Sequence, residues 1–153
     1  WPLELHGEYA GAIHRFWEVI YGTRLATVAA INGGAAGAAL NIALACVIAV
    51  AARCAAFLQP FANLGLVPDA GGTFTLPRLV GLGRARALAL LAEKIDADTA
   101  ERWGLIYKAF EDDAFAAETA KITARLASLP TDGLAAINRA FDEAATNSLN
   151  AQL

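Results

Sequence analysis

The chain has 153 residues, of which 57% are hydrophobic and 18% are charged, and its formal net charge is −3. This length suits one domain with its own core, and the high apolar content suggests surface that is buried against further structure or neighbouring subunits. The slightly acidic charge without a basic cluster argues against nucleic acid as a partner, and no apolar run is long enough to cross a bilayer.

Hydrophobic periodicity predicts alternating helices and strands in the first half of the chain. An apolar stripe at helical spacing marks the first helix, and a β-branched run that ends at Asn32 marks a buried strand entering a turn. The expected elements are a helix over residues 4–21, a strand over 25–31, a small-residue turn over 32–39, an alanine-rich helix through about residue 46, a strand over 47–51 and a short candidate partner strand at 56–57.

The second half of the chain predicts further helices around one strand. Gly81 and Gly83 break a helical pattern, and Asp96 is expected to cap the N-terminus of a helix with its carboxylate. The expected elements are an irregular segment over 61–68, helices over 73–80, 84–91 and 96–103, a strand over 105–110, a helix over 114–129 and another from residue 131. This alternation argues for a single α/β domain in which helices cover sheet.

Residues 32–39, Asn-Gly-Gly-Ala-Ala-Gly-Ala-Ala, form the first segment that could carry chemistry. Small residues let a ligand approach the main chain, and a helix N-terminus offers unpaired N–H groups that can bind phosphate or a developing oxyanion. Tight packing of the helix against a strand explains the same residues. The phosphate-loop and dinucleotide patterns do not fit, because the required lysine and acidic residues are absent.

Residues 65–73, Gly-Leu-Val-Pro-Asp-Ala-Gly-Gly-Thr, form the second such segment. Asp69 lies there between a proline and a Gly-Gly pair, among apolar neighbours. A carboxyl group in apolar surroundings holds its proton to higher pH, which suits proton transfer near neutral pH. Capping of the following helix is an equally good explanation of Asp69, and the two roles are compatible.

The two segments, in this order and at this separation, resemble the crotonase superfamily of enoyl-CoA hydratases and isomerases. Residues 27–33 look like that family's strand before the active-site helix, and residues 37–46 look like the helix itself. The match continues through residues 57–61, 65–73, 76–81 and 100–106. The resemblance implies a crotonase-like ββα spiral core over about residues 1–110, a helical region over 111–153, and an N-terminal part of the family fold that this chain does not contain.

The resemblance also implies roles for individual residues. The family's thioester oxyanion hole uses two backbone N–H groups, one of which aligns with Ala38, while the other lies in an earlier segment of the family fold. Family hydratases use two catalytic glutamates, and the matching positions here hold Asn41 and Phe61, which cannot transfer a proton as a carboxylate does. Together with Gly37 and Leu64, these two residues are expected to line the substrate pocket.

Asp69 stands where family hydratases usually have glycine, which resembles the branch that isomerises ring-1,2-epoxyphenylacetyl-CoA in phenylacetate degradation. The implied activity is acyl-CoA isomerisation, either double-bond migration or epoxide rearrangement. Asp69 would move a proton while the Ala38 N–H stabilises the thioester enolate. Related dehalogenases use an aspartate here as a nucleophile, but they carry tryptophan where this chain has Phe61, which disfavours that alternative.

Two other functions stay open: an enoyl-CoA hydratase-like lyase, and a non-catalytic acyl-CoA-binding fragment or interaction protein. The resemblance implies an acyl-CoA partner, a place in fatty acid metabolism, and trimers or dimers of trimers. Coenzyme A arrives with the substrate, so we expect no metal and no separate cofactor. Cys46 and Cys54 fit core positions in a reducing cytoplasm better than a disulfide, so we expect a cytoplasmic protein.

Overall fold

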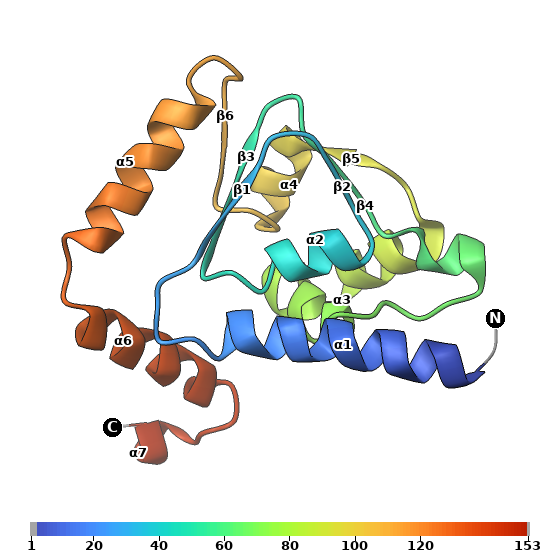
Figure 1. The fold of residues 1–153 in the computed structure, drawn as a ribbon, viewed down its shortest axis with the longest axis horizontal. Helices are drawn as coiled ribbons and strands as arrows, with labels where there is room; N and C mark the ends of the chain where they lie inside the picture. Colours follow the sequence, from blue (N-terminus) through green and yellow to red (C-terminus); the bar gives the residue numbers. More distant parts are fainter. Residues whose placement is uncertain (1–2, 153) are drawn as a thin grey trace.

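The computed structural model describes residues 3–152, with side chains described for residues 11–152. Figure 1 shows helices arranged around two small sheets. In chain order the elements are α1 (Leu3–Tyr21), β1 (Val28–Ile31), β2 (Gly34–Ala36), α2 (Ala38–Ala43), β3 (Ile48–Ala52), β4 (Ala56–Leu58), the 3₁₀ helix η1 (Pro60–Leu64), α3 (Gly72–Leu91), β5 (Ile95–Asp96), α4 (Ala97–Trp103), β6 (Lys108–Phe110), α5 (Phe115–Ala127), α6 (Thr131–Ala144) and α7 (Leu149–Gln152).

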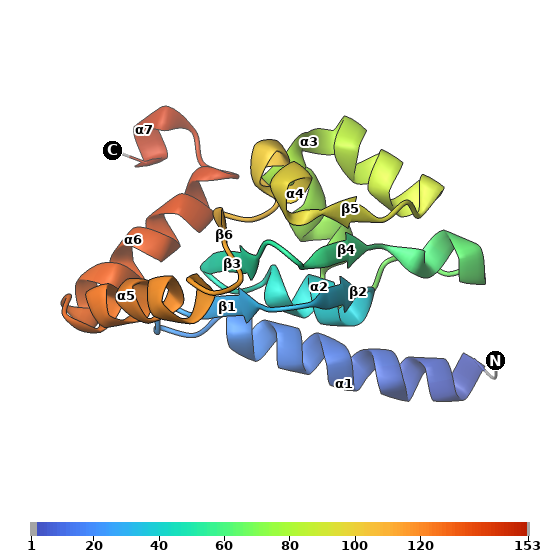
Figure 2. The same cartoon turned by 90° about the horizontal axis from the view of Figure 1, so that it is seen from above.

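The two sheets are built by a repeated strand–strand–helix unit. β1, β3 and β6 form one parallel sheet, while β2 and β4 pair in parallel in the second sheet and β5 joins β4 antiparallel. The chain passes from β1 to β2 and then α2, and again from β3 to β4 and then α3. Figure 2 shows α1 along one side of the strands and α3 and α4 along the other. The expected ββα spiral is therefore present.

The pairing of one expected strand and the position of another strand differ from the sequence-based expectation. The strand at residues 56–57 pairs with β2 and β5, not with the strand at 47–51, because a corner after β3 carries the chain into the second sheet. Residues 34–36, expected in a turn, form strand β2, whose Ala35 lies opposite Phe57. Small residues have little strand preference of their own, so this strand depends on its partner.

The predicted break within α3 and the predicted N-terminal cap of α4 are both confirmed. Gly81 leaves helical geometry inside α3, with φ 79° and ψ 158°. Asp96 caps α4, and its Oδ1 accepts a hydrogen bond from the Thr99 N–H at 2.7 Å. Hydrogen bonding from Thr99, first from its side chain and then from its backbone, lowers the pKa of Asp96, because it favours the ionised carboxylate.

The cap predicts a measurable loss of stability. We expect Asp96→Ala to lower the unfolding midpoint by about 3 °C, because Thr99 loses its acceptor at the start of α4. Asp96→Asn is the matched control, since an asparagine side chain caps a helix about as well. Thermal unfolding followed by circular dichroism checks both variants. Equal midpoints for Asp96→Ala and wild type would contradict the capping role.

The hydrophobic core lies between the sheets and helices α2, α3 and α4. Its largest fully buried apolar side chains are Phe57, Leu40, Leu76, Leu105 and Val50. The cysteines divide between core and surface: Cys46 is half-buried, whereas Cys54 is exposed and so was wrongly expected in the core. Cys54 follows β3 at the corner, where its N–H donates to the Asp112 carboxylate at 2.9 Å.

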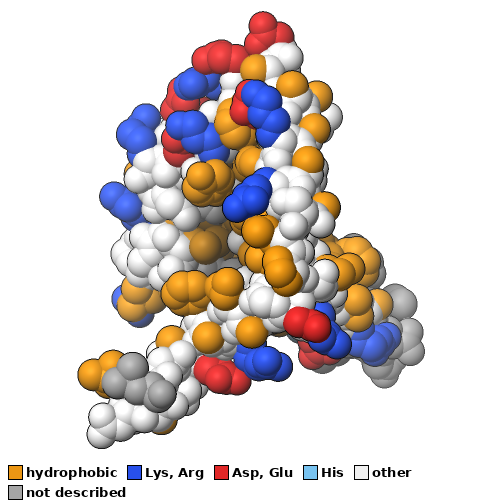
Figure 3. Space-filling model, turned by 90° about the vertical axis from the view of Figure 1, so that its left-hand side faces the viewer, with side chains coloured by type: hydrophobic (Ala, Val, Ile, Leu, Met, Phe, Trp, Pro, Cys, Tyr) orange, Lys and Arg blue, Asp and Glu red, His pale blue; other side chains and the backbone are white. Residues whose placement is uncertain are grey.

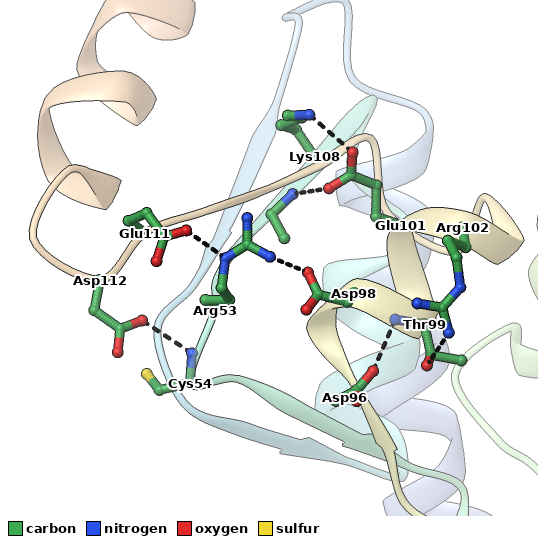
Figure 4. Close-up of polar contacts among 11 residues, drawn as sticks. Arg53, Cys54, Asp96, Asp98, Thr99, Glu101, Arg102, Lys108, Glu111 and Asp112 are labelled. Atoms are coloured by element: carbon green, nitrogen blue, oxygen red, sulfur yellow. Dashed lines mark hydrogen bonds and ion pairs between the residues drawn. The ribbon is translucent and has the colours of Figure 1, made fainter.

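A network of charged side chains joins α4 to the ends of β3 and β6 (Figure 4). Arg53 pairs with Asp98 and Glu111 at once. Glu101 accepts a bond from Lys108 at 2.9 Å and another from the Ala109 N–H at 2.8 Å, which fixes the backbone of β6. These hydrogen bonds, that from Ala109 above all, lower the pKa of Glu101 below its ordinary value of 4.5.

This network predicts a pH-dependent contribution to stability. A carboxyl group with a lowered pKa in the folded chain stabilises it above the ordinary pKa, and that contribution is lost as the pH falls through the lowered value. We expect Glu101→Gln to unfold more readily than wild type near neutral pH and to approach wild type in acid, below 4.5. Urea unfolding over a pH series measures the difference. A difference that stays constant with pH would contradict the ionic role.

Helices α5, α6 and α7 bury no residue completely. Ile137, Phe141 and Leu149 are large apolar side chains that stay exposed there. Figure 3, which looks onto this side of the molecule, shows hydrophobic side chains between groups of charged ones. Over the described residues, no helix is both long and apolar enough to span a membrane.

Candidate active site at the N-terminus of α2

The first predicted segment places a backbone N–H group at the start of α2. Gly37 precedes the helix with φ 55° and ψ −129°, a conformation that favours glycine, and Ala38 is the first helical residue. The Gly37 N–H donates to the Leu58 carbonyl at 3.0 Å, which ties the helix start to β4. In the first turn of a helix the N–H groups have no partner within the helix, so that of Ala38 suits an oxyanion.

The second predicted segment is a tight turn that leads into α3. The Asp69 carbonyl accepts the Gly72 N–H at 2.8 Å. Between them Ala70 and Gly71 both have positive φ, 43° and 71°. A Cβ on Gly71 would lie 2.4 Å from the Trp17 ring, so α1 packs directly on this turn. The turn that follows Asp69 is therefore held by its own backbone hydrogen bond and by its contact with α1.

A buried amide pair connects the two segments. The Asn41 Nδ2 donates to the backbone carbonyl of Asp69 at 2.9 Å, and the Gln59 Nε2 donates to the Asn41 Oδ1 at 2.7 Å. Asn41 and Gln59 are both 0% exposed. Asn41 lies three residues after Ala38, about 4.5 Å further along the helix axis. The structure thus ties the Asp69 turn to α2, the helix that begins at Ala38.

The other predicted pocket residues lie at different depths. Phe61 is buried, with its ring 3.5 Å from where a Cβ on Gly37 would stand. Leu64, at the end of η1, is 67% exposed. Asp69 is partly buried, and its Oδ1 has almost no exposed area. Gly37, Asn41, Phe61 and Asp69 therefore gather around the first turn of α2, and Leu64 lies at the margin.

Sequence reasoning did not single out Gln59 as a functional residue. Its neighbours form the Phe-Leu-Gln-Pro-Phe phrase at residues 57–61, but the pairing of Gln59 with Asn41 spans 18 positions. The sequence offers one signal for Gln59: it is a polar residue within an otherwise apolar segment. Among the described residues, no group of three or more His, Cys, Asp and Glu side chains is placed to hold a metal ion.

A cavity of about 800 Å³ lies away from these residues, between the end of α1, α3 and α6. Tyr21 lines it and donates a hydrogen bond to Asp142 at 2.7 Å. Burial, and then this bond, raise the pKa of Tyr21 to about 12. Arg78 also lines the cavity, with its guanidinium 3.5 Å from the centre of the Phe74 ring. None of the residues predicted for the active site lines this cavity.

Comparison with known proteins identifies the family. The sequence profile of the enoyl-CoA hydratase/isomerase family matches residues 3–153. The chain belongs to this family. It is 48% identical over 136 residues to a probable enoyl-CoA hydratase of Rhodobacter capsulatus, a match that covers 89% of the chain and 53% of that relative.

Two further members of the enoyl-CoA hydratase/isomerase family are also similar. The chain is 44% identical over 126 residues to the 1,2-epoxyphenylacetyl-CoA isomerase of Escherichia coli, with 82% of the chain and 48% of the relative covered. The crystal structure of an enoyl-CoA hydratase from Bacillus anthracis superimposes with a TM-score of 0.94 at 27% identity, covering 99% of the chain and 59% of that structure.

The crotonase resemblance and the α/β fold class are thereby confirmed. The chain spans about half the length of the curated relatives it matches. The enoyl-CoA hydratase/isomerase family, to which the chain belongs, consists of enzymes that act on acyl-CoA thioesters. Its named members include both hydratases and an isomerase, so the choice between these reactions depends on the residues of the site.

Proposed function

We propose that the full-length protein is an acyl-CoA isomerase that works through a thioester enolate, with Asp69 as its acid/base. The observation that carries the proposal is the distribution of carboxylates around α2. The two positions that match the hydratase glutamates hold Asn41 and Phe61, and Asp69 is presented on the turn bonded to Asn41. One carboxylate suits moving a proton between two carbons better than adding water.

The proposed reaction on a 3-enoyl-CoA has two proton transfers. The Asp69 carboxylate takes a proton from C2, and the electron pair delocalises through the C3–C4 double bond and the thioester carbonyl. The Ala38 N–H donates a hydrogen bond to the carbonyl oxygen, which carries the developing negative charge. The protonated Asp69 then returns the proton to C4, and the double bond moves to C2–C3. The product is a conjugated 2-enoyl-CoA, and no electron is gained or lost.

The proposal extends to the cofactor requirement, a second substrate type and the oligomeric state. Coenzyme A enters as part of the substrate, so we propose that no metal or separate redox cofactor takes part. The similarity to the Escherichia coli isomerase supports an epoxidised aromatic acyl-CoA as a second substrate type, in phenylacetate degradation. Exposed Phe141 and Leu149 on the C-terminal helices support a homo-oligomer, for which we propose a trimer or a dimer of trimers in the cytoplasm.

The alternative function is an enoyl-CoA hydratase-like lyase, which the relative in Rhodobacter capsulatus favours by its name. Hydration adds water across C2–C3 and therefore needs a group to activate that water and a group to protonate C2. Asn41 and Phe61 supply neither. A non-catalytic acyl-CoA-binding role is the third candidate.

The absorbance of the conjugated thioester distinguishes these functions. Full-length protein is mixed in separate experiments with a 3-enoyl-CoA and with the matching 2-enoyl-CoA. An isomerase raises the absorbance in the first experiment and leaves most of it in the second, because the conjugated product is the more stable isomer. A fall in the second experiment would instead identify a hydratase. No change in either would leave the non-catalytic role.

A further inference from the structure

The side chain of Asn41 occupies a fixed orientation inside the core. The Asp69 carbonyl oxygen can only accept a hydrogen bond, so the Asn41 group facing it at 2.9 Å must be the NH₂ group. The Asn41 Oδ1 then faces Gln59 at 2.7 Å, and Gln59 must present its own NH₂ group there. The two amides therefore have a single consistent arrangement, which ends on the backbone of Asp69.

The turn after Asp69 packs closely on the Asn41 amide. A Cβ on Gly72 would lie 2.4 Å from the Asn41 Nδ2, so the amide lies directly against the turn after Asp69. The Asn41 amide is completely buried with its NH₂ group and its oxygen both paired, and a buried donor or acceptor that loses its partner is costly. An amide enclosed in this way cannot rotate toward a ligand without losing both hydrogen bonds.

We propose that Asn41 and Gln59 are positioning residues, which hold the Asp69 turn through its backbone carbonyl and do not touch the substrate. This inference rests on the proposed acid/base role of Asp69, and it replaces substrate contact as the expected role of Asn41. Asn41 belongs to α2, the helix that also carries the Ala38 N–H. The pair therefore sets the distance between the proton-transferring carboxylate and the oxyanion donor.

The expected kinetic effect is a loss of turnover without a loss of binding. A reacting group displaced by about 1 Å can lose about a hundredfold in rate. We expect Asn41→Leu to lower kcat by about tenfold to a hundredfold, and Gln59→Met by a smaller factor, with KM changed less than about threefold in both. Asp96→Ala is the control, because it removes the cap of α4, a helix that holds none of the proposed site residues, and should leave kcat unchanged.

A double-mutant cycle with Asp69→Asn separates positioning from a merely structural role. If Asn41 acts through Asp69, Asn41→Leu causes no further loss of kcat once Asp69 is asparagine. A structural role would repeat the same fold-loss in both backgrounds. The rates are measured on full-length protein with a 3-enoyl-CoA, at enzyme concentrations high enough to quantify the Asp69→Asn rate. If Asn41→Leu does not fold, the same double-mutant cycle is measured with Gln59→Met and Asp69→Asn.

Each outcome decides one of the two proposals. Loss of kcat at constant KM, absent in the Asp69→Asn background, supports the positioning role. A raised KM with unchanged kcat would show that Asn41 contacts substrate and would overturn the inference, as would equal losses in both backgrounds. If Asp69→Asn alone retains wild-type activity, the proposed function itself fails, and the cycle identifies that failure separately.

Discussion

Asp69→Asn is expected to lower kcat for double-bond migration by about a thousandfold, within the range that positioned acid–base groups contribute. Asparagine keeps the size of the side chain and one of its two acceptor oxygens but cannot take up and return a proton at neutral pH. The backbone carbonyl of residue 69 accepts hydrogen bonds from the Asn41 side chain and the Gly72 N–H, which do not involve the Asp69 side chain, so the substitution should leave the fold in place.

The matched control is Asp113→Asn, which removes the same charge from an exposed position before α5 and should leave kcat unchanged. Initial rates at saturating 3-enoyl-CoA measure both variants, and circular dichroism verifies that both are folded. If Asp69→Asn loses less than about tenfold, Asp69 is not the proton shuttle, since acid–base groups contribute at least about a hundredfold.

Ala38→Pro should remove the oxyanion donor while keeping α2. Ala38 is the first residue of the helix, and proline is well accepted at that position because its missing N–H has no partner within the helix. Loss of one oxyanion donor typically costs about 3 kcal/mol of transition-state stabilisation, so we expect kcat to fall by about a hundredfold or more. The free energy of unfolding should change far less than the activation free energy.

The control for Ala38→Pro is Thr131→Pro, which places proline at the first position of α6. Thr131 is exposed, and the preceding Pro130 has the extended conformation that a following proline prefers. Both variants are compared with wild type by kcat and by urea unfolding. Full activity of a folded Ala38→Pro variant would exclude the Ala38 N–H from the reaction.

The elements that sequence reasoning predicted well are those with a local signal. The apolar stripe of α1, the glycine break in α3 and the Asp96 cap of α4 each depend on residues within a few positions of one another. Strand β2 could not be predicted in this way. Gly34, Ala35 and Ala36 favour no strand by themselves, and they become one because β4 pairs with them from 22 positions further along the chain.

The same distinction applies to the candidate site. Asp69 and Ala38 could be singled out as candidate site residues because each lies in a recognisable sequence motif. Their roles stay predictions. The surroundings of Asn41 depended on contacts that no local pattern contains. Its partners, Gln59 and the Asp69 carbonyl, lie 18 and 28 positions away. Burial of the amide inside the core, rather than at the surface of a pocket, is a product of tertiary packing.

The most direct test of enolate chemistry is proton exchange at C2 of an acyl-CoA that cannot complete an isomerisation. Phenylacetyl-CoA suits this purpose, because the ring acidifies its C2 protons. Full-length protein and its Asp69→Asn variant are each incubated with it in D₂O, and deuterium at C2 is followed by mass spectrometry. We expect exchange catalysed by wild type and lost in Asp69→Asn. Exchange that is absent with wild type, or undiminished in the variant, would contradict an enolate formed by Asp69.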